Sequence, residues 1–290
     1  MSNAIELACP AKLNLFLHIV GRRDDGYHLL QSVFQLIDWC DVLTLKLIPE
    51  NEVRRNNPIP GVPPEQDLVV RAAQLLKEHC RIDRGVEISL KKNIPMGAGL
   101  GGGSSDAAST LIGLNTLWDL HLDIATLCQL GLQLGADVPF FIFGQNAFVE
   151  GVGEKLQAIS LETQDYVVIF PNKGVATAQI FQDPQLTQDH APITIDRFLA
   201  SPRSYQSNDC QAVAVQKCPE VKQALDWIYK AVPNSAPCMS GSGSSIFAAL
   251  DPKTDRTNLE NLLQNLPKGW IGQIVRGLNK NPAYNLVSSD

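Results

Sequence analysis

The glycine-rich stretch NIPMGAGLGGGSSDAAS, residues 93–109, constrains the fold of this chain more than any other segment. It follows the strand-like sequence GVEISLKK and ends in small, helix-forming residues. Glycines let backbone N–H groups approach a ligand closely, and a helix start adds free N–H groups and a positive dipole end. The stretch predicts a polyphosphate-binding loop between a strand and a helix that begins at Ser104 or Ser105. A flexible loop with Ser105 as a plain helix N-cap is the alternative.

Familiar nucleotide motifs do not account for this loop. Residues 97–102 match G-x-G-x-x-G, but the acidic residues about 20 positions on, Asp119 and Asp123, fall in a predicted helix-to-helix connection rather than after a strand. Residues 97–104 match G-x-x-x-x-G-K-[ST] except that Gly103 replaces the lysine. The protein-kinase motifs V-A-I-K, H-R-D and D-F-G are absent from the sequence. A cation from elsewhere must therefore balance the phosphates.

Lys12 is the leading candidate for that cation. The segment AKLNLFLHIV alternates, so Lys12, Asn14, Phe16 and His18 share one face of a strand that we expect to be exposed to solvent. Asn14 would lie roughly 7 Å from Lys12 on that face. An exposed edge strand explains the same alternation without any function. The lysines at 91 and 92, directly before the loop, are rival candidates.

Asp137, in LGADVPFF, is the candidate for the chemical step. Phosphoryl transfer needs phosphates held in line, a neutralising cation and a carboxylate that orients the accepting hydroxyl. A neighbouring lysine would keep such a carboxylate ionised. The structural alternative is that Asp137 only caps a short helix with Pro139 in its first turn.

Three further features could contact a substrate. Tyr27 and His28, in DDGYHLL, could stack on and hydrogen-bond a base, or could simply anchor a turn. Phe181, in TAQIF, is a typical core residue by composition. The stretch SGSGSS, residues 240–245, is a second loop of small residues that could contact a ligand or form a tight β-turn.

The remaining pattern predicts mixed α/β structure in the first half and α+β structure in the second. We place the domains at 1–155 and 156–290, with the last strand a candidate to return to the first domain. The polar stretch 182–208 has no predicted structure. Two strands joined by a short connection are expected at 33–37 and 41–48, helices at 68–80, 104–118, 124–134, 219–231 and 258–266, and further strands at 85–92, 147–152, 166–171, 246–250 and 270–278.

Composition excludes several classes of function. A net charge of -6 over 290 residues argues against binding to nucleic acid or an anionic membrane surface. The seven cysteines are scattered without a C-x-x-C pair, which is typical of reduced thiols. The N-terminus does not resemble a signal peptide, and the apolar runs are too short to span a bilayer. We predict a cytoplasmic monomer or weak homodimer that acts on a small molecule.

Three segments taken together resemble the GHMP kinase superfamily over nearly the whole chain. They are PAKLNLFLHIVGRRDDGYHLLQSVF, then IPMGAGLGGGSSDAAS with GADVPFF, then MSGSGSSIFAAL, in this order. The resemblance implies an α+β fold of two domains. The first would be an α/β domain like domain 2 of ribosomal protein S5, the second would be ferredoxin-like, and the active site would lie in the cleft between them.

The resemblance also implies the reactants. ATP would be the phosphoryl donor, accompanied by Mg²⁺, and the acceptor would be a hydroxyl of a cytidine-diphospho sugar alcohol. The metal would be carried by ATP, with Ser104 or Ser105 as candidate ligands. A GHMP kinase acting on mevalonate, homoserine or a sugar is the alternative, as is an ATP-binding sensor without catalytic activity.

Site roles carry over from the resemblance residue by residue. Lys12 and Asp137 would form the catalytic pair, with Asn14 beside the transferred group. Tyr27 and His28 would hold the cytosine, with Phe181 on its opposite face, and Thr177 would lie on the substrate side. The ATP phosphates would be wrapped by Pro95, Met96, Gly97, Ala98, Gly99, Leu100, Gly101, Gly102, Gly103, Ser104 and Ser105.

Overall fold

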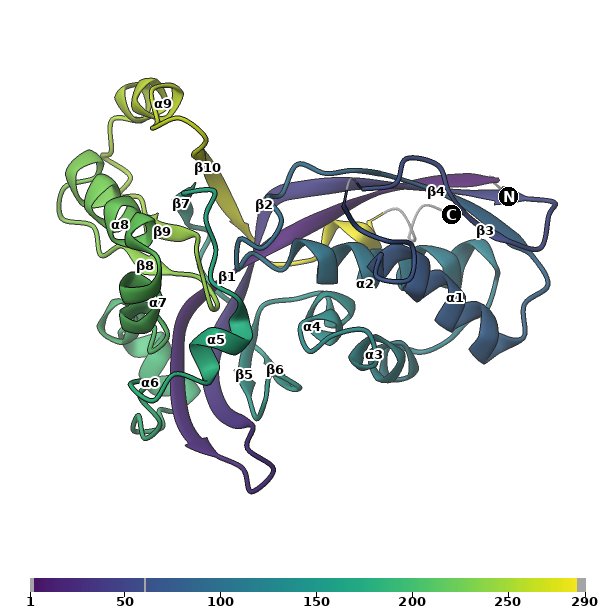
Figure 1. Cartoon of the computed structure of the whole chain (residues 1–290), viewed down its shortest axis with the longest axis horizontal. Helices are drawn as coiled ribbons and strands as arrows, with labels where there is room; N and C mark the ends of the chain where they lie inside the picture. Colours follow the sequence, from purple (N-terminus) through teal and green to yellow (C-terminus); the bar gives the residue numbers. More distant parts are fainter. Residues whose placement is uncertain (1–2, 60, 286–290) are drawn as a thin grey trace.

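Two long antiparallel strands, β1 (Ala4–Arg22) and β2 (His28–Ile48), run through both halves of the molecule (Figure 1). The computed structural model describes residues 3–59 and 61–285. The two strands are joined by a tight turn in which Gly26 has a φ of 90°. Because this hairpin crosses the whole molecule, side chains on β1 can contribute to a site shared by the two halves.

Strand β2 is continuous, so the prediction of two strands over this segment was wrong. The register changes between Pro10 and Ala11 of β1, which leaves Asp38 and Trp39 of β2 without a partner on that strand. The carboxylate of Asp38 instead accepts a hydrogen bond from the backbone N–H of Arg276 at 2.7 Å. A bulge of this kind lets a polar residue leave the ladder without ending the strand.

Four helices cover one face of the first sheet (Figure 1). Buried apolar side chains from the sheet and the helices form one core cluster between these layers. Asp67 and Asp123 cap two of the helices, because each side chain accepts a backbone N–H in the first turn of its helix. The helices are α1 (Leu68–Cys80), α2 (Gly102–Leu117), α3 (Ile124–Leu132) and α4 (Val138–Phe143), and the further strands are β3 (Val53–Arg55), β4 (Gly85–Lys91), β5 (Ala147–Glu150) and β6 (Lys155–Ala158).

The second half adds a smaller group of strands with helices packed on it (Figure 1). Strand β10 pairs with β7 along most of its length, and its last residues, Gly277 and Leu278, pair with β2. The strands are β7 (Asp165–Phe170), β8 (Cys238–Met239), β9 (Ile246–Ala249) and β10 (Ile271–Leu278). The helices are α5 (Thr177–Phe181), α6 (Ile195–Ala200), α7 (Gln211–Lys217), α8 (Pro219–Ala231) and α9 (Arg256–Gln264), with 3₁₀ turns η1 (Pro202–Tyr205) and η2 (Pro282–Tyr284).

Sheet pairing therefore continues from one half of the chain into the other through β10 and β2. The domain limits of 1–155 and 156–290 stay a prediction. All seven cysteines are free thiols. Within the described parts of the chain, no helix is both long enough and apolar enough to cross a membrane.

The polar stretch without a predicted structure forms a strap, residues 182–209, laid along β1. Three backbone hydrogen bonds attach it: Leu17 N–H to the Ser207 carbonyl, Asp209 N–H to the Leu17 carbonyl, and His190 N–H to the Ile19 carbonyl, each at 2.9 Å. These bonds join residues more than 170 positions apart and leave no local sequence pattern. The position of the strap along β1 therefore could not be predicted from the composition of the strap itself.

The prediction that one face of β1 is exposed to solvent is also wrong. Lys12, Asn14, Phe16 and His18 are between 0% and 3% exposed, since residues from both halves of the chain pack against them. The expected alternation is interrupted as well, because the register with β2 changes between Asn14 and Leu17. A buried lysine is rare unless it has a partner or a function, so the burial of Lys12 marks this face as a candidate site.

A stacked histidine pair holds the strap against β1. The rings of His18 and His190 are parallel within 8° and 3.6 Å apart. His18 Nε2 lies 2.8 Å from Ser207 Oγ, and His190 Nδ1 lies 3.1 Å from an Asp209 carboxylate oxygen. Burial, together with the neighbouring His190, lowers the pKa of His18 to about 4. The neutral form of His18 is therefore the form that fits the fold.

This pKa predicts that stability is lost in mild acid. In the unfolded chain His18 binds a proton below about pH 6.5, whereas the folded chain resists protonation down to about pH 4. The free energy of unfolding should therefore fall by about 2 kcal/mol through His18 alone between pH 8 and pH 5. Denaturant unfolding across this range should show a shallower pH dependence for H18Q. The exposed control H121Q should match the wild type, and an unchanged slope in H18Q would contradict the assignment.

Candidate active site

The glycine loop between β4 and α2 is built by backbone conformation. Helix α2 begins at Gly102, so the predicted start at Ser104 or Ser105 is corrected by two to three residues. Its N-cap, Gly101, is left-handed with a φ of 72°, and no side chain caps the helix. Gly97 and Gly99 also have positive φ, 67° and 77°. Side chains at these positions would strain the loop, which explains its alternating glycines better than simple flexibility does.

Close packing imposes a second requirement on this loop. A Cβ atom on Gly99 would lie 2.4 Å from the Ser240 carbonyl oxygen, and one on Gly101 would lie 3.1 Å from Lys12 Cγ. The backbone N–H of Lys12 donates to the Leu100 carbonyl at 2.9 Å. The glycine loop is therefore held against β1 on one side and against the second loop of small residues on the other.

Gly99 should not tolerate even alanine. G99A combines a left-handed φ with a backbone clash at Ser240, so we expect the free energy of unfolding to fall by about 1–3 kcal/mol and ATP affinity to fall with it. G103A is the matched control, because it lies within α2 and its nearest neighbour, Leu68 Cδ1, is 3.4 Å away. Denaturant unfolding compares the two variants, and nucleotide titration compares G99A with the wild type. Equal behaviour of the two would contradict the close packing.

Lys12 and Asp137 face each other beside this loop. Lys12 Nζ lies 3.7 Å from Asp137 Oδ2, donates to the side-chain oxygen of Asn14, and lies 4.9 Å from the centre of the Phe34 ring. The Lys12 side chain is 4% exposed, whereas that of Asp137 is 33% exposed. Burial lowers the pKa of Lys12, and the negative charge of Asp137 opposes that shift. The pair thus places a buried cation behind a carboxylate that a ligand can reach.

Asp137 does occupy the N-cap position of α4, with proline in the first turn. Its side chain nevertheless makes no capping hydrogen bond. The capping alternative therefore describes its place in the backbone but not what its carboxylate does. The carboxylate is directed to Lys12 instead.

The rival cation Lys92 is already paired. Its ammonium donates to Asp41 and, at 2.7 Å, to Asp106. Burial acts to lower the pKa of Lys92, but the two carboxylates outweigh it and raise that pKa. Lys91 is an exposed residue at the end of β4. Among the three candidate lysines, Lys12 is the one that pairs with Asp137.

Two cavities meet at the glycine loop. One, of about 810 Å³, lies between the two halves of the chain, and the other, of about 320 Å³, lies beside α1 and α2. Both include Gly97, Gly99 and Gly101 in their walls. We call them the acceptor cavity and the loop cavity. The acceptor cavity is lined by all seven of the predicted catalytic and substrate-binding residues: Lys12, Asn14, Tyr27, His28, Asp137, Thr177 and Phe181.

The predicted base-binding residues lie close together in the wall of the acceptor cavity, where the His28 ring contacts the Phe181 ring directly. The His28 and Phe181 rings are 5.5 Å apart, and Tyr27, which is 65% exposed, stands at the edge. Burial, with a smaller effect from Arg22, lowers the pKa of His28 and favours its neutral form. Thr177 Oγ1 lies 2.8 Å from Ser242 Oγ. Phe181 also packs against the second-half core, which its composition suggested.

Most of the glycine stretch lines the loop cavity, from Pro95 through Ser104. Ser105 is the exception, because it is 0% exposed and belongs to neither wall. Sequence reasoning missed the apolar residues that complete the walls. Ile59, Val62, Leu68 and Val69 line the loop cavity, and Leu17, Leu30, Phe34, Val175 and Ala178 line the acceptor cavity.

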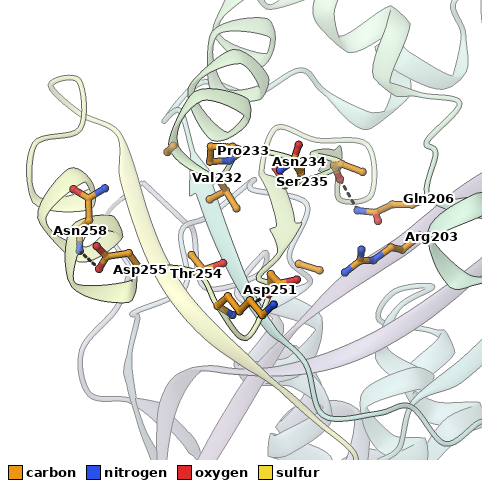
Figure 2. Close-up of a pocket in the computed structure, with 14 residues that line it drawn as sticks. Arg203, Gln206, Val232, Pro233, Asn234, Ser235, Asp251, Thr254, Asp255 and Asn258 are labelled. Atoms are coloured by element: carbon orange, nitrogen blue, oxygen red, sulfur yellow. Dashed lines mark hydrogen bonds between the residues drawn. The ribbon is translucent and has the colours of Figure 1, made fainter.

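A third cavity, of about 510 Å³, lies in the second half of the chain (Figure 2). Its described walls share no residue with the acceptor cavity. Arg203 and Lys253 are balanced there by Asp251 and Asp255, whose carboxylates accept backbone N–H groups. With its formal charges cancelled, this cavity does not suit a polyphosphate.

Comparison with known families fits this geometry. The family model described as the GHMP kinases N terminal domain matches residues 67–145, and the one described as GHMP kinases C terminal matches residues 197–271. The N-terminal match includes the glycine loop and helix α2. The chain belongs to the GHMP kinase family.

Individual relatives are more specific. The chain is 76% identical over 287 residues to 4-diphosphocytidyl-2-C-methyl-D-erythritol kinase of Polynucleobacter asymbioticus, covering 99% of this chain and 98% of that one. It is 50% identical over 286 residues to the protein of the same name in Burkholderia mallei, covering 96% of each. A crystal structure of 4-(cytidine 5'-diphospho)-2C-methyl-D-erythritol kinase superposes with a TM-score of 0.80 at 32% identity, covering 95% of this chain and all of that one.

Proposed function

We propose that this chain transfers the γ-phosphoryl group of ATP to the 2-hydroxyl of 4-diphosphocytidyl-2-C-methyl-D-erythritol. This reaction is a step of the non-mevalonate route to isoprenoid precursors. The observation that carries the proposal is the Lys12 and Asp137 pair, which lies in the acceptor cavity directly beside the glycine loop. The near full-length identity to kinases of this name supports the choice of acceptor.

In the chemical step, the acceptor oxygen forms a bond to the γ-phosphorus while the bond from that phosphorus to the bridging oxygen of ADP breaks. The carboxylate of Asp137 orients the hydroxyl and receives its proton, and ADP leaves with the bridging oxygen. The ammonium of Lys12 offsets the negative charge of the phosphoryl oxygens during transfer. Because Lys12 is buried, this attraction is weakened less by water than it would be at the surface.

The supporting hydrogen bonds explain how Lys12 keeps its position. Asn14 accepts from the Lys12 ammonium and donates its own N–H₂ to Ser32 Oγ at 3.0 Å. The backbone N–H of Asn14 donates to Ser240 Oγ at 3.2 Å. The ammonium is thus fixed by residues from β1, β2 and the second half of the chain, so transfer would not have to wait for it to be ordered.

The acceptor cavity suits a cytidine nucleotide. Tyr27, His28 and Phe181 supply aromatic walls for the base, and the neutral imidazole of His28 can donate or accept a hydrogen bond at its edge. Thr177 and Ser242 supply hydroxyls near the glycine loop. The loop cavity, with its apolar walls and adjoining glycines, would hold ATP.

Magnesium fits this arrangement through the hydroxyls at the start of α2. Ser105 Oγ is buried without a hydrogen-bond partner among the described residues, and Ser104 lines the loop cavity one position earlier. Of the two, the Ser104 hydroxyl, which lines the loop cavity, would hold Mg²⁺ together with the ATP phosphates. Bound there, Mg²⁺ would neutralise charge on the phosphates. Residence in the cytoplasm and a monomer or weak homodimer state remain predictions from the sequence.

The test is a direct assay of the full-length protein with ATP, MgCl₂ and the cytidyl substrate. We expect ADP together with a product heavier by one phosphoryl group, and phosphorus NMR should place that group on the 2-hydroxyl. Mevalonate, homoserine and galactose, offered separately, should give little turnover. Preference for one of these would favour another GHMP kinase activity, and tight ATP binding without turnover on any acceptor would favour a sensor.

A further inference from the structure

The second loop of small residues, SGSGSS, forms part of the acceptor site. Together with Met239 before it, we call it the second glycine loop, residues 239–245. Gly241, Ser242 and Gly243 line the acceptor cavity. Ser240 Oγ lies 3.1 Å from the Gly99 carbonyl oxygen, to which it donates, and the backbone N–H of Ser245 donates to the Ala98 carbonyl at 3.0 Å. The two glycine loops are thus hydrogen-bonded to each other.

This loop also lies directly over the catalytic lysine. A Cβ atom added to Gly241 would come within 3.5 Å of both Lys12 Nζ and Asn14 Oδ1. Gly241 has a φ of 59°, so its conformation depends on the absence of a side chain. A small shift of the second glycine loop would therefore change the surroundings of Lys12 and the shape of the acceptor cavity together.

Asn208, at the end of the strap, holds this loop. Its side-chain N–H₂ donates to the Met239 carbonyl at 2.7 Å and to the Gly241 carbonyl at 2.8 Å. Its side-chain oxygen accepts from the backbone N–H of Cys210 at 2.9 Å. Asn208 is 7% exposed, so water offers little substitute for these bonds. Only a carboxamide supplies two donors and one acceptor on such a short side chain.

The strap fixes Asn208 relative to β1. Ser207 and Asp209, the residues on either side of Asn208, each form a backbone hydrogen bond with Leu17 at 2.9 Å. The carboxylate of Asp209 accepts from the backbone N–H of Ile19 at 2.7 Å. Asn208 therefore connects β1, the strand that carries Lys12, to the loop that lies over Lys12.

We propose that Asn208 is a positioning residue for phosphoryl transfer, which sets the second glycine loop over Lys12 and Asn14. This inference rests on the proposed function, since it concerns the same site. Asn208 touches neither reactant cavity, because it is absent from their described walls. It acts through the Met239 and Gly241 carbonyls, and its loss should lower the rate of transfer more than it lowers ATP affinity.

The decisive variant is N208D. The carboxylate keeps the size of asparagine and the acceptor for Cys210, but turns an oxygen toward two carbonyl oxygens and repels them. We expect kcat to fall about 10- to 100-fold while the Kd for ATP stays within about three-fold of the wild type. The kcat of N208S, whose side chain has one donor, should lie between the kcat of N208D and that of the wild type. Q206A is the matched control on the same strap, because Gln206 donates to Ala236, outside the loop.

Two readouts separate positioning from a general loss of structure. Burial beside carbonyl groups raises the pKa of the N208D carboxyl, and its protonated form regains one donor. The kcat of N208D relative to the wild type should therefore rise as the pH falls from 8 to 6. Amide hydrogen exchange in residues 239–245 should be faster in N208D than in wild type or Q206A.

Unchanged kcat and unchanged exchange in N208D would overturn the proposal, as would equal losses in N208D and Q206A. If N208D does not fold, N208S decides between the same outcomes. Failure of the proposed function is a separate result. It would appear as absent wild-type turnover, whereas the exchange of residues 239–245 reports on Asn208 without any substrate.

Discussion

Replacing Asp137 by asparagine is expected to lower kcat by about 100- to 10,000-fold, the range that a positioned proton acceptor contributes. Asparagine keeps the size of the side chain and can still contact the hydroxyl, but it takes no proton at neutral pH. ATP affinity should change little, because the nucleotide is expected at the glycine loop. Calorimetric titration with ATP and an assay of ADP release measure the two quantities.

The fold should survive this change. Asp137 makes no capping hydrogen bond, so the start of α4 keeps its support, but the buried Lys12 ammonium loses its charged partner and the unfolding midpoint of D137N should fall modestly. D123N is the matched control, since Asp123 is an N-cap of α3 and asparagine caps helices as well as aspartate does. Activity of D137N within ten-fold of the wild type would remove Asp137 from the chemical step.

Replacing Lys12 by methionine should lower kcat about 100- to 1,000-fold, as expected for loss of one charged group that stabilises the transition state. Methionine preserves the apolar stem that packs beside Gly101, so the loop keeps its support. The carboxylate left behind, Asp137, is partly exposed and does not become an unpaired buried charge. Steady-state kinetics and thermal unfolding should therefore show a severe loss of activity with little loss of stability.

The control for K12M is K91M. Lys91 directly precedes the glycine loop in the sequence and was a rival candidate for the cation, but it is exposed at the end of β4. K91M should retain nearly full activity and show only a small change in its dependence on salt. Similar losses in K12M and K91M would mean that general positive charge, rather than the position of Lys12, supports the reaction.

Local features of the site were predictable because each leaves a local sequence signal. Alternating glycines before small helix formers indicate left-handed turns at a helix start. Asp137 beside Pro139 indicates a helix start, where the residue was indeed found. The overall GHMP kinase fold followed from three such segments in their order, and the family match confirms it.

Features made by distant segments were not predictable in this way. The burial of Lys12 and His18 depends on the strap and on the second glycine loop, which lie about 190 and 230 residues away. Strand β2 continues between the two predicted strands because β1 and β2 change register between Pro10 and Ala11 of β1. The sequence of β2 alone does not reveal this bulge. No local sequence pattern marks Asn208, because it acts through hydrogen bonds to two backbone carbonyl groups, and any residue type can supply a carbonyl.

The helix start illustrates how a correct idea can still misplace a boundary. Serines are preferred helix caps, so Ser104 and Ser105 were reasonable choices. Gly101 takes the position instead, because its left-handed conformation turns the chain while leaving room for the Lys12 stem and the Phe141 ring. Packing against residues far away in the sequence decided where the helix begins.

A crystal structure of the protein with a non-hydrolysable ATP analogue and the cytidyl substrate tests the central claim most directly. The account predicts that the accepting hydroxyl lies within about 2.6–3.2 Å of an Asp137 carboxylate oxygen. It also predicts that the γ-phosphate lies between the glycine loop and Lys12, and that the cytosine lies against Tyr27, His28 and Phe181. A substrate bound with its hydroxyl beyond reach of Asp137, or phosphates bound away from the glycine loop, would contradict it.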